Sequence, residues 1–211
     1  SELSIGTDTA LNVIVEAMDK IKESGIASRR CFVVETMGRD CGYLALMSGI
    51  AAGAERIYTN EDGISLDDLA NDVHWLRESF AHGRRLFLAV RNENASHNYT
   101  TDFIARLLEE ESHGMYDVRQ VVLGHMQQGG SPSPFDRLLA NRLGYRALNL
   151  IDDELAAHQD GSWFIGVNES GMRPCSMDTM PSLIDAAHRR PREQWWLQLR
   201  TIARMVSDEV R

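Results

Sequence analysis

The chain has 211 residues, of which 43% are hydrophobic and 25% are charged, as in a globular protein with one sizeable core or one and a half α/β lobes. A formal net charge of −9 at pH 7 argues against broad nucleic-acid binding, because a polyanion would be repelled. No apolar run approaches the ~20 residues that span a bilayer, and three scattered cysteines argue against a disulfide framework or a zinc site. We therefore expect a cytoplasmic protein.

Helix and strand patterns alternate along the first 123 residues. Apolar positions at helical spacing predict a helix over residues 4–24, and short runs of β-forming residues predict strands over 31–35, 56–59, 86–90 and 117–123. Helical patterns separate these strands at 40–53, 65–82 and 100–111. This alternation is typical of an α/β fold, in which helices cover both faces of a parallel sheet in a Rossmann-like, three-layer lobe.

The remaining residues predict part of a second α/β lobe. A helix over 135–151 precedes a polar connection over 152–161 and a strand over 163–167. A short helix or turn over 181–188 and a terminal helix over 193–210 complete the chain, with Trp195, Leu199, Ile202 and Val206 along one side of that helix. We therefore expect one lobe over residues 1–125 and the carboxy-terminal part of an adjoining lobe over 126–211.

Polar residues directly follow three of the predicted strands. Met37 and Gly38 follow the first strand, Glu93 follows the third, and His125 follows the fourth. In an open parallel sheet, ligands bind outside the carboxyl ends of the strands. We therefore expect these residues to lie along one edge of the sheet, at a binding site.

The stretch Val121–Arg137, VVLGHMQQGGSPSPFDR, leads from the last of these strands into a helix. Its glycine pairs let backbone amides approach a ligand, and a helix N-terminus can hold an anion. A glycine loop that merely joins two elements has the same pattern. A phosphorylated ligand would also need converging arginines, and the candidates are Arg29, Arg30, Arg39, Arg119, Arg189 and Arg190.

Five separated motifs resemble those of the 6-phosphofructokinases and occur in that family's order. They are SIGTDTALN from Ser4, FVVETMGRDCGYLA from Phe32, VRNENASHNYTTDF from Val90, the stretch Val121–Arg137, and HRRPREQWWLQLR from His188. The resemblance is closest to the carboxy-terminal, effector-binding half of the long eukaryotic-type chains. It spans nearly the whole sequence.

The resemblance implies a set of sugar-phosphate contacts. In it, Glu93 would accept hydrogen bonds from sugar hydroxyls, His125 would contact the sugar phosphate, and Arg30 and Arg119 would reach a phosphate across a subunit boundary. Without the family, His125 is equally a core histidine, and each arginine is a surface charge. The complete implied set is Arg30, Met37, Gly38, Arg39, Glu93, Arg119, His125, Met126, Gln127, Gln128 and Arg189, the last holding a second phosphate.

Two positions of this set favour different roles. Catalytic halves of the family carry an arginine where this chain has Gln128, and losing that guanidinium removes a fixed charge and a bidentate phosphate contact. Arg39 favours the catalytic role, because in catalytic halves an arginine there would neutralise the transferring phosphoryl group. A solvated arginine at a helix start is the alternative reading of Arg39.

Several motifs of a complete kinase are absent from the sequence. It contains no GxxxxGK phosphate loop, no Gly-Gly-Asp-Gly and no Thr-Ile-Asp-Asn-Asp. The family's catalytic aspartate is expected just before Ser1, in an upstream part that we expect to be missing. ATP and Mg²⁺, the cofactors of the family's kinases, have no binding motif here, so we expect this chain alone to be inactive.

The sequence therefore predicts a carboxy-terminal piece of a glycolytic, ATP-dependent 6-phosphofructokinase, which converts fructose 6-phosphate to fructose 1,6-bisphosphate. This piece would bind fructose 2,6-bisphosphate as an allosteric effector, adjoin the missing N-terminal part and belong to an oligomer. Two other readings stay open. One is a catalytic half that uses ATP or pyrophosphate, and the other is a free-standing, non-enzymatic sugar-phosphate-binding module.

Overall fold

The computed structural model describes residues 3–25, 27–158, 160–168 and 171–207, and these fall into two compact units. We call the first the hairpin unit, which comprises Ser1–Thr9 and Gly130–Trp195 as far as they are described. The second is the sheet unit, which comprises Ala10–Gly129 and Trp196–Arg211, again as far as they are described. No helix among the described residues combines the length and the apolar character that a membrane span requires.

Four parallel strands form the centre of the sheet unit, in the order β2-β3-β1-β4. Their bounds are Arg30–Thr36 for β1, Arg56–Tyr58 for β2, Leu86–Asn92 for β3 and Asp117–Val122 for β4. Because the strands are parallel and in close register, the segments that follow β1, β3 and β4 all leave the sheet at its carboxyl edge.

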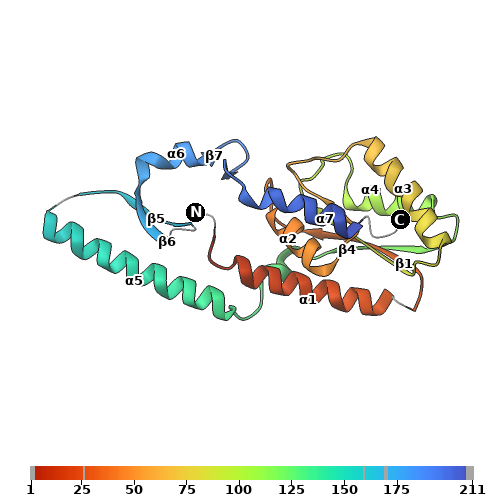
Figure 1. Cartoon of the computed structure of the whole chain (residues 1–211), viewed down its shortest axis with the longest axis horizontal. Coiled ribbons are helices and arrows are strands. Elements are labelled where there is room, and N and C mark those ends of the chain that lie inside the picture. Colours follow the sequence, from red (N-terminus) through yellow and green to blue (C-terminus); the bar gives the residue numbers. More distant parts are fainter. Residues whose placement is uncertain (1–2, 26, 159, 169–170, 208–211) are drawn as a thin grey trace. The chain divides into compact units, whose positions relative to one another are not determined.

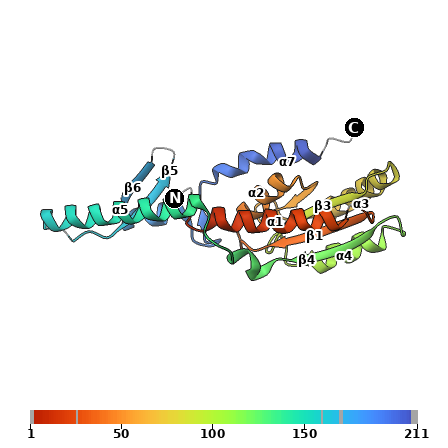
Figure 2. The same cartoon turned by 90° about the horizontal axis from the view of Figure 1, so that it is seen from below.

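Helices cover both faces of this sheet. The helices α1, Thr7–Gly25, and α2, Tyr43–Ala52, lie on one face, whereas α3, Leu66–Ala81, and α4, Thr101–Glu110, lie on the other. Figure 2 shows α2 above the strands and α4 beneath them. The predicted α/β fold with a parallel sheet is therefore confirmed.

Alternating side chains of β1 supply both halves of the core. Cys31 and Val33 pack toward α3 and α4, whereas Phe32 and Val34 pack toward α1 and α2. Burial raises the pKa of the Cys31 thiol, which is fully enclosed. This continuous burial explains why the run Cys31–Val34 has no polar alternation, as expected of a strand covered on both faces.

Two helices of the sheet unit, α3 and α4, begin where their capping residues predict. Ser65 precedes α3, and its hydroxyl accepts a hydrogen bond from the amide of Asp68 while the Asp68 carboxylate accepts one from the amide of Ser65. The hydroxyl of Thr100 accepts from the amide of Phe103 at the start of α4. Such caps satisfy amides that have no partner within the helix.

The hairpin unit combines one long helix with two antiparallel ribbons (Figure 1). Helix α5 spans Pro134–Ala157, β5 spans Trp163–Asn168 and pairs with β6 at Gly171–Ser176, and β7 at Ile184–Asp185 pairs with β8 at Arg190–Pro191. A 3₁₀ turn, Met177–Thr179, and the single-turn α6, Met180–Leu183, connect the ribbons.

One buried carboxylate ties the start of the chain to α5. Asp136 accepts hydrogen bonds from the amide of Gly6 at 2.9 Å, the amide of Thr9 at 2.8 Å and the hydroxyl of Thr9 at 2.5 Å. Burial alone would raise the pKa of Asp136, but these hydrogen bonds outweigh it and lower the pKa. The ionised form is therefore the one that holds the chain start in place.

Two predictions for the second half of the chain were wrong. Residues 152–157 belong to α5 instead of a polar connection, because Asp152, Asp153 and Glu154 continue its exposed surface up to His158, which is left-handed with φ 52°. The strand β6 was not predicted, because Pro174 weakens a strand pattern, yet proline is tolerated in a two-stranded ribbon that has free edges.

The predicted helix or turn over 181–188 splits between α6 and β7, and the end of the chain also differs from its prediction. It begins as a 3₁₀ helix, Trp195–Leu199, and continues as α7, Arg200–Ser207. The tighter turn buries Trp196, which is 3% exposed, and leaves Trp195 39% exposed, so the predicted apolar side is wrong at its first position. Residues 208–210 and the Val206 side chain lie outside the described residues.

Candidate functional site

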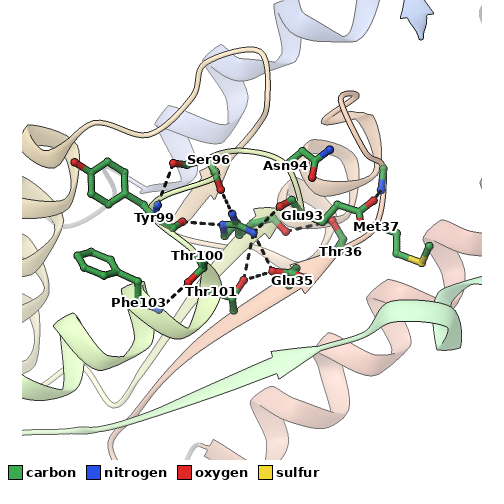
Figure 3. Close-up of polar contacts among 12 residues, drawn as sticks. Glu35, Thr36, Met37, Glu93, Asn94, Ser96, Tyr99, Thr100, Thr101 and Phe103 are labelled. Carbon is green, nitrogen blue, oxygen red and sulfur yellow. Dashed lines mark hydrogen bonds and ion pairs between the residues drawn. The ribbon is translucent and has the colours of Figure 1, made fainter. Parts of the chain in front are cut away.

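The segments after β1, β3 and β4 meet at the carboxyl edge of the sheet unit. Glu93 follows β3, and its Oε1 accepts hydrogen bonds from the amides of Gly38 at 2.9 Å and Arg39 at 2.6 Å, both after β1. Its own amide donates to the carbonyl of Thr36 at 2.9 Å. Figure 3 shows Glu93 beside Thr36 and Met37. One oxygen of this carboxylate therefore already accepts hydrogen bonds from the turn after β1. The other oxygen remains to accept from a ligand.

Gln127 joins the third segment to the first. Its side chain is only 2% exposed, its Oε1 accepts from the amide of Met37 at 2.9 Å, and its Nε2 lies 3.5 Å from the carbonyl of Met37. The carboxamide thus pairs with both the amide and the carbonyl of one residue, as a neighbouring strand would. Gln127 was predicted as a ligand contact, and the structure places it inside the wall of the site.

The other residues of this segment face outward. Gly124–Gln128 form a 3₁₀ helix, and His125, Met126 and Gln128 are exposed. Nδ1 of His125 lies 2.9 Å from Oε1 of Gln128, so these two predicted residues form a pair. If Nδ1 carries the proton, Nε2 is the ring nitrogen that is free to accept a hydrogen bond.

Arg39 lies in an unusual backbone conformation. Its φ is 50°, in the left-handed region that residues other than glycine rarely adopt, and its side chain is exposed. Because the Arg39 amide donates to Glu93, the contact across the site holds this conformation. The turn delays the start of α2 to Tyr43, three residues after the predicted start, and presents the guanidinium to solvent at the sheet edge.

Two predicted arginines lie away from this cluster, and a third belongs to the other unit. Arg30 is the first residue of β1, about 20 Å along the strand from the carboxyl edge, and Arg119 lies early in the edge strand β4, opposite Phe32. Arg119 is exposed and contacts Asp117 at 3.8 Å. Arg189 belongs to the hairpin unit, where it has φ 52° and lines a cavity of about 240 Å³ with Phe164 and Ile184 among others.

Sequence reasoning missed four side chains that support the site. Asn94 donates to the carboxylate of Asp40 at 2.9 Å, and the buried Asn92 lies 3.5 Å from the carbonyl of Cys41. Arg91 and Glu35 form a buried ion pair at 2.9 Å. The sequence did contain one signal for the ion pair. Arg91 directly continues the apolar run Leu86–Val90, and a charge in such a position needs a partner.

The resulting site offers hydrogen-bond donors and positive charge to an anion. The exposed guanidinium of Arg39 and the ring of His125 belong to two of the segments that meet at this edge, and a free carboxylate oxygen of Glu93 can accept from a hydroxyl. Within the described residues, no group of three or more His, Cys, Asp or Glu side chains is arranged to hold a metal ion. This chemistry fits a small molecule that carries both anionic and hydroxyl groups.

Comparison with known proteins identifies the family. A family model described as Phosphofructokinase matches residues 1–151, which is more than half of the chain. The chain belongs to the phosphofructokinase family. The resemblance seen in the sequence motifs is therefore confirmed at the level of the family.

Curated phosphofructokinases match over almost the whole chain. The ATP-dependent 6-phosphofructokinase of Dictyostelium discoideum is 42% identical over 209 residues, and the human muscle-type enzyme is 42% identical over 218 residues. Each match covers 98% of this chain, but only 25% of the Dictyostelium protein and 28% of the human protein. The chain thus spans about a quarter of the length of these relatives.

Solved structures agree with this assignment. Phosphofructokinase from Saccharomyces cerevisiae superposes with a TM-score of 0.93 at 34% identity, over 100% of this chain and 29% of the yeast chain. A pyrophosphate-dependent phosphofructokinase from Marinobacter aquaeolei superposes with a TM-score of 0.63 at 15% identity, over 95% of this chain and 54% of its own. The second likeness supports the fold alone.

Proposed function

We propose that this chain is the sugar-phosphate-binding portion of an ATP-dependent 6-phosphofructokinase and that its ligand is the effector fructose 2,6-bisphosphate. One observation carries the proposal. The segments with Met37–Arg39, Glu93 and His125–Gln128 converge at one sheet edge, in a chain that is 42% identical to ATP-dependent 6-phosphofructokinases. Sugar hydroxyls and phosphate groups match the acceptors and donors of that edge.

Each exposed group has a role in this proposal. The guanidinium of Arg39 donates to phosphate oxygens, as does Nε2 of His125 when both ring nitrogens carry protons, whereas the second carboxylate oxygen of Glu93 accepts from a sugar hydroxyl. Gln127 keeps the peptide of Met37 in place and does not touch the ligand.

Gln128 supports the effector role over the catalytic one. A glutamine amide is neutral, and here it pairs with His125, so this position supplies neither the charge nor the bidentate contact of an arginine. The second candidate function, a catalytic half that transfers phosphoryl from ATP or pyrophosphate, rests on the exposed guanidinium of Arg39. A free-standing sugar-phosphate-binding module is the third.

Arg30 and Arg119 serve the site of a neighbouring copy in the proposed oligomer. Arg119 is exposed on β4, an edge strand that pairs only with β1 among the described strands. It lies too far back along the strand to join the cluster at Glu93. An edge strand with an exposed cation is suited to contact a second subunit.

The complete enzyme also needs the parts that the chain lacks. ATP, Mg²⁺ and the catalytic base are supplied by the rest of the polypeptide in our proposal, because the relatives are about four times longer. The same part covers the apolar side chains that α5 exposes, which are Phe135, Leu138, Tyr145, Leu148, Ile151 and Leu155. The enzyme acts in the cytoplasm, in glycolysis.

Calorimetry with fructose 2,6-bisphosphate tests the effector site in the full-length protein. Replacing His125 or Arg119 by Ala should weaken binding by about 1.5–3 kcal/mol each, the value typical of charged hydrogen bonds. The controls are His74→Ala and Arg106→Ala, which remove exposed side chains of the same kinds on α3 and α4. Unchanged affinity in both test variants would contradict the site.

A second experiment separates the effector role from the catalytic one. Gln128→Arg restores the cation of catalytic halves, so it should tighten binding of fructose 6-phosphate if this half is an effector site. Arg39→Gly should abolish phosphoryl transfer only if this half is catalytic. Full activity of Arg39→Gly together with lost response to fructose 2,6-bisphosphate would support the effector role.

A further inference from the structure

Arg91 is a fully enclosed cation next to the candidate site. It is the penultimate residue of β3 and only 2% exposed, although a buried guanidinium is costly unless its donors are all engaged. Burial lowers the pKa of Arg91, while the neighbouring Glu35 acts in the opposite direction. Such a group persists in a core only where several acceptors are arranged around it.

Those acceptors come from β1, from α4 and, above all, from one loop. Nη1 of Arg91 lies 2.9 Å from Oε2 of Glu35 on β1 and 3.4 Å from the hydroxyl of Thr101 on α4. The other acceptors are backbone carbonyls of the loop between β3 and α4, namely Glu93 at 3.0 Å, Ser96 at 2.6 Å and Tyr99 at 3.2 Å. Figure 3 shows these residues gathered around the guanidinium.

This arrangement fixes where Glu93 can point. Its carbonyl is held by Arg91, its amide by Thr36, and its carboxylate by the amides of Gly38 and Arg39. The hydroxyl of Thr101 also donates to Glu35. The two side chains that contact the guanidinium from β1 and α4 are thus bonded to each other. The loop from Glu93 to Tyr99 therefore has a conformation that gives each of the three guanidinium nitrogens of Arg91 a carbonyl acceptor.

Other buried ion pairs of the sheet unit differ from this one. Arg56 pairs with Asp72, and Arg84 pairs with Glu55, and both guanidinium groups stack on the ring of Trp75. Each pair joins regular elements or strand ends, and these contacts of Arg56 and Arg84 lie outside the loop after β3. Only Arg91 among these three arginines combines an ion pair with three carbonyls of one loop.

We propose that Arg91 is a positioning residue of the sugar-phosphate site, which holds Glu93 against the amides of Gly38 and Arg39 so that the second carboxylate oxygen faces the ligand. The ligand part of this inference rests on the proposed function. The guanidinium fork is essential, because a lysine ammonium keeps the charge but cannot reach Glu35 and three carbonyls together.

Amide hydrogen exchange in the unliganded, full-length protein tests the positioning role without any ligand. In Arg91→Lys, the amides of Gly38 and Arg39 should exchange about tenfold faster, because Glu93 no longer stays in place to accept from them. Arg56→Lys is the matched control, since it weakens a different buried ion pair and should leave these two amides unchanged. Unchanged exchange in Arg91→Lys would overturn the proposal.

A milder pair of variants covers the case in which Arg91→Lys does not fold. Thr101→Val removes the hydroxyl that bridges Glu35 and Arg91 at nearly constant volume, whereas Thr101→Ser keeps it. Exchange at Gly38 and Arg39 should rise in the valine variant and stay near the wild-type rate in the serine variant. Equal rates in the two variants would also overturn the proposal.

A double-mutant cycle with fructose 2,6-bisphosphate then tests the link to the ligand. Arg91→Lys should weaken binding about tenfold in the wild type but less than about twofold in a Glu93→Gln background, because both changes act through one carboxylate. Additive losses would overturn the positioning role. Faster exchange with unchanged affinity in every variant would support the hold on Glu93 and overturn the ligand assignment of the proposed function.

Discussion

The sheet unit and the hairpin unit bury their apolar residues to very different degrees. Leu69, Leu76 and Leu88 of the sheet unit are at most 1% exposed, whereas Leu138 and Leu148 of α5 are 64% and 63% exposed. A sheet with helices on both faces covers its own apolar surface. A long helix beside a two-stranded ribbon does not.

This difference shows which contacts stabilise each unit. Burial of a leucine contributes about 1.5–3 kcal/mol, so the sheet unit obtains its stability from its own core. In α5, only Asp136 and Leu139 are buried, and individual polar contacts such as the Asp136 hydrogen bonds are correspondingly more important. We expect the sheet unit to tolerate separation from the rest of the enzyme better than the hairpin unit.

The largest effect should come from the core of the sheet unit. Phe80 is fully buried and stacks on Tyr116 with ring centroids 4.4 Å apart. Phe80→Ala removes this ring and leaves a cavity, so the free energy of unfolding should fall by about 3–5 kcal/mol in urea denaturation. Leu148→Ala, on the exposed side of α5, should change it by less than about 0.5 kcal/mol in the isolated chain.

The same pair of variants can contradict the comparison. If Leu148→Ala lowered the free energy of unfolding of the isolated chain as much as Phe80→Ala does, α5 would bury this side chain after all. In the full-length protein, by contrast, Leu148→Ala should cost about 2–5 kcal/mol, because we propose that the rest of the polypeptide covers this residue.

Asp136→Asn should produce the next largest effect, in the hairpin unit. An amide cannot replace the carboxylate that accepts from Gly6 and twice from Thr9, so the free energy of unfolding should fall by about 2–3 kcal/mol at pH 7. Thermal denaturation of the two proteins provides the measurement. The control is Asp152→Asn, because Asp152 is exposed on the same helix.

The Asp136 effect should also depend on pH. Since the folded state lowers the pKa of Asp136, its contribution is fully present above the ordinary carboxyl pKa of ~3.9 and is lost as the pH falls through the lower folded-state pKa. The wild type and Asp136→Asn should therefore become more similar in stability below about pH 4. A constant difference down to acidic pH would show that the charge of Asp136 is not responsible.

Gln127→Ala should have a smaller effect, at the site. It leaves the amide of Met37 without its acceptor, and the free energy of unfolding should fall by about 1–2 kcal/mol. Gln128→Ala is the matched control, since Gln128 is exposed and should affect stability by less than about 0.5 kcal/mol. Equal effects of the two variants in urea denaturation would show that the buried position of Gln127 has no energetic role.

The smallest effect should come from a helix cap. Ser65→Ala removes the hydroxyl that accepts from the amide of Asp68, and loss of such a cap costs about 1 kcal/mol. Hydrogen bonds from Ser65 also lower the pKa of Asp68, so the Asp68 pKa should rise toward its ordinary value in the variant, as measured by NMR titration. Ser65→Thr, which keeps a hydroxyl, should behave like the wild type.

Local patterns predicted most of the sheet unit. Each strand and helix there is encoded by consecutive residues, and the Ser65 cap lies within three positions of its partner. The meeting of Met37, Glu93 and the His125 segment followed from the rule that parallel strands end at one edge. These features depend on short-range sequence or on general topology, so they were accessible without coordinates.

Long-range side-chain contacts could not be predicted in this way. Asp136 accepts from Gly6, 130 positions earlier, and Gln127 turns inward to Met37, 90 positions earlier, although its neighbours Met126 and Gln128 are exposed. No periodic pattern distinguishes these residues. Their orientation is set by tertiary packing, which also explains why the buried role of Arg91 was missed.

The enclosed thiol of Cys31 allows the opening of the sheet unit to be followed by mass spectrometry. Cys31 lies in the core of the sheet unit, whereas the partly exposed Cys175 lies on β6 of the hairpin unit. An alkylating reagent reacts with an accessible thiolate, so it should modify Cys175 in the native protein and Cys31 only when the sheet opens. The mass added to the Cys31 peptide over time thus gives the opening rate of the sheet unit, whereas Cys175 reacts without opening of the hairpin unit.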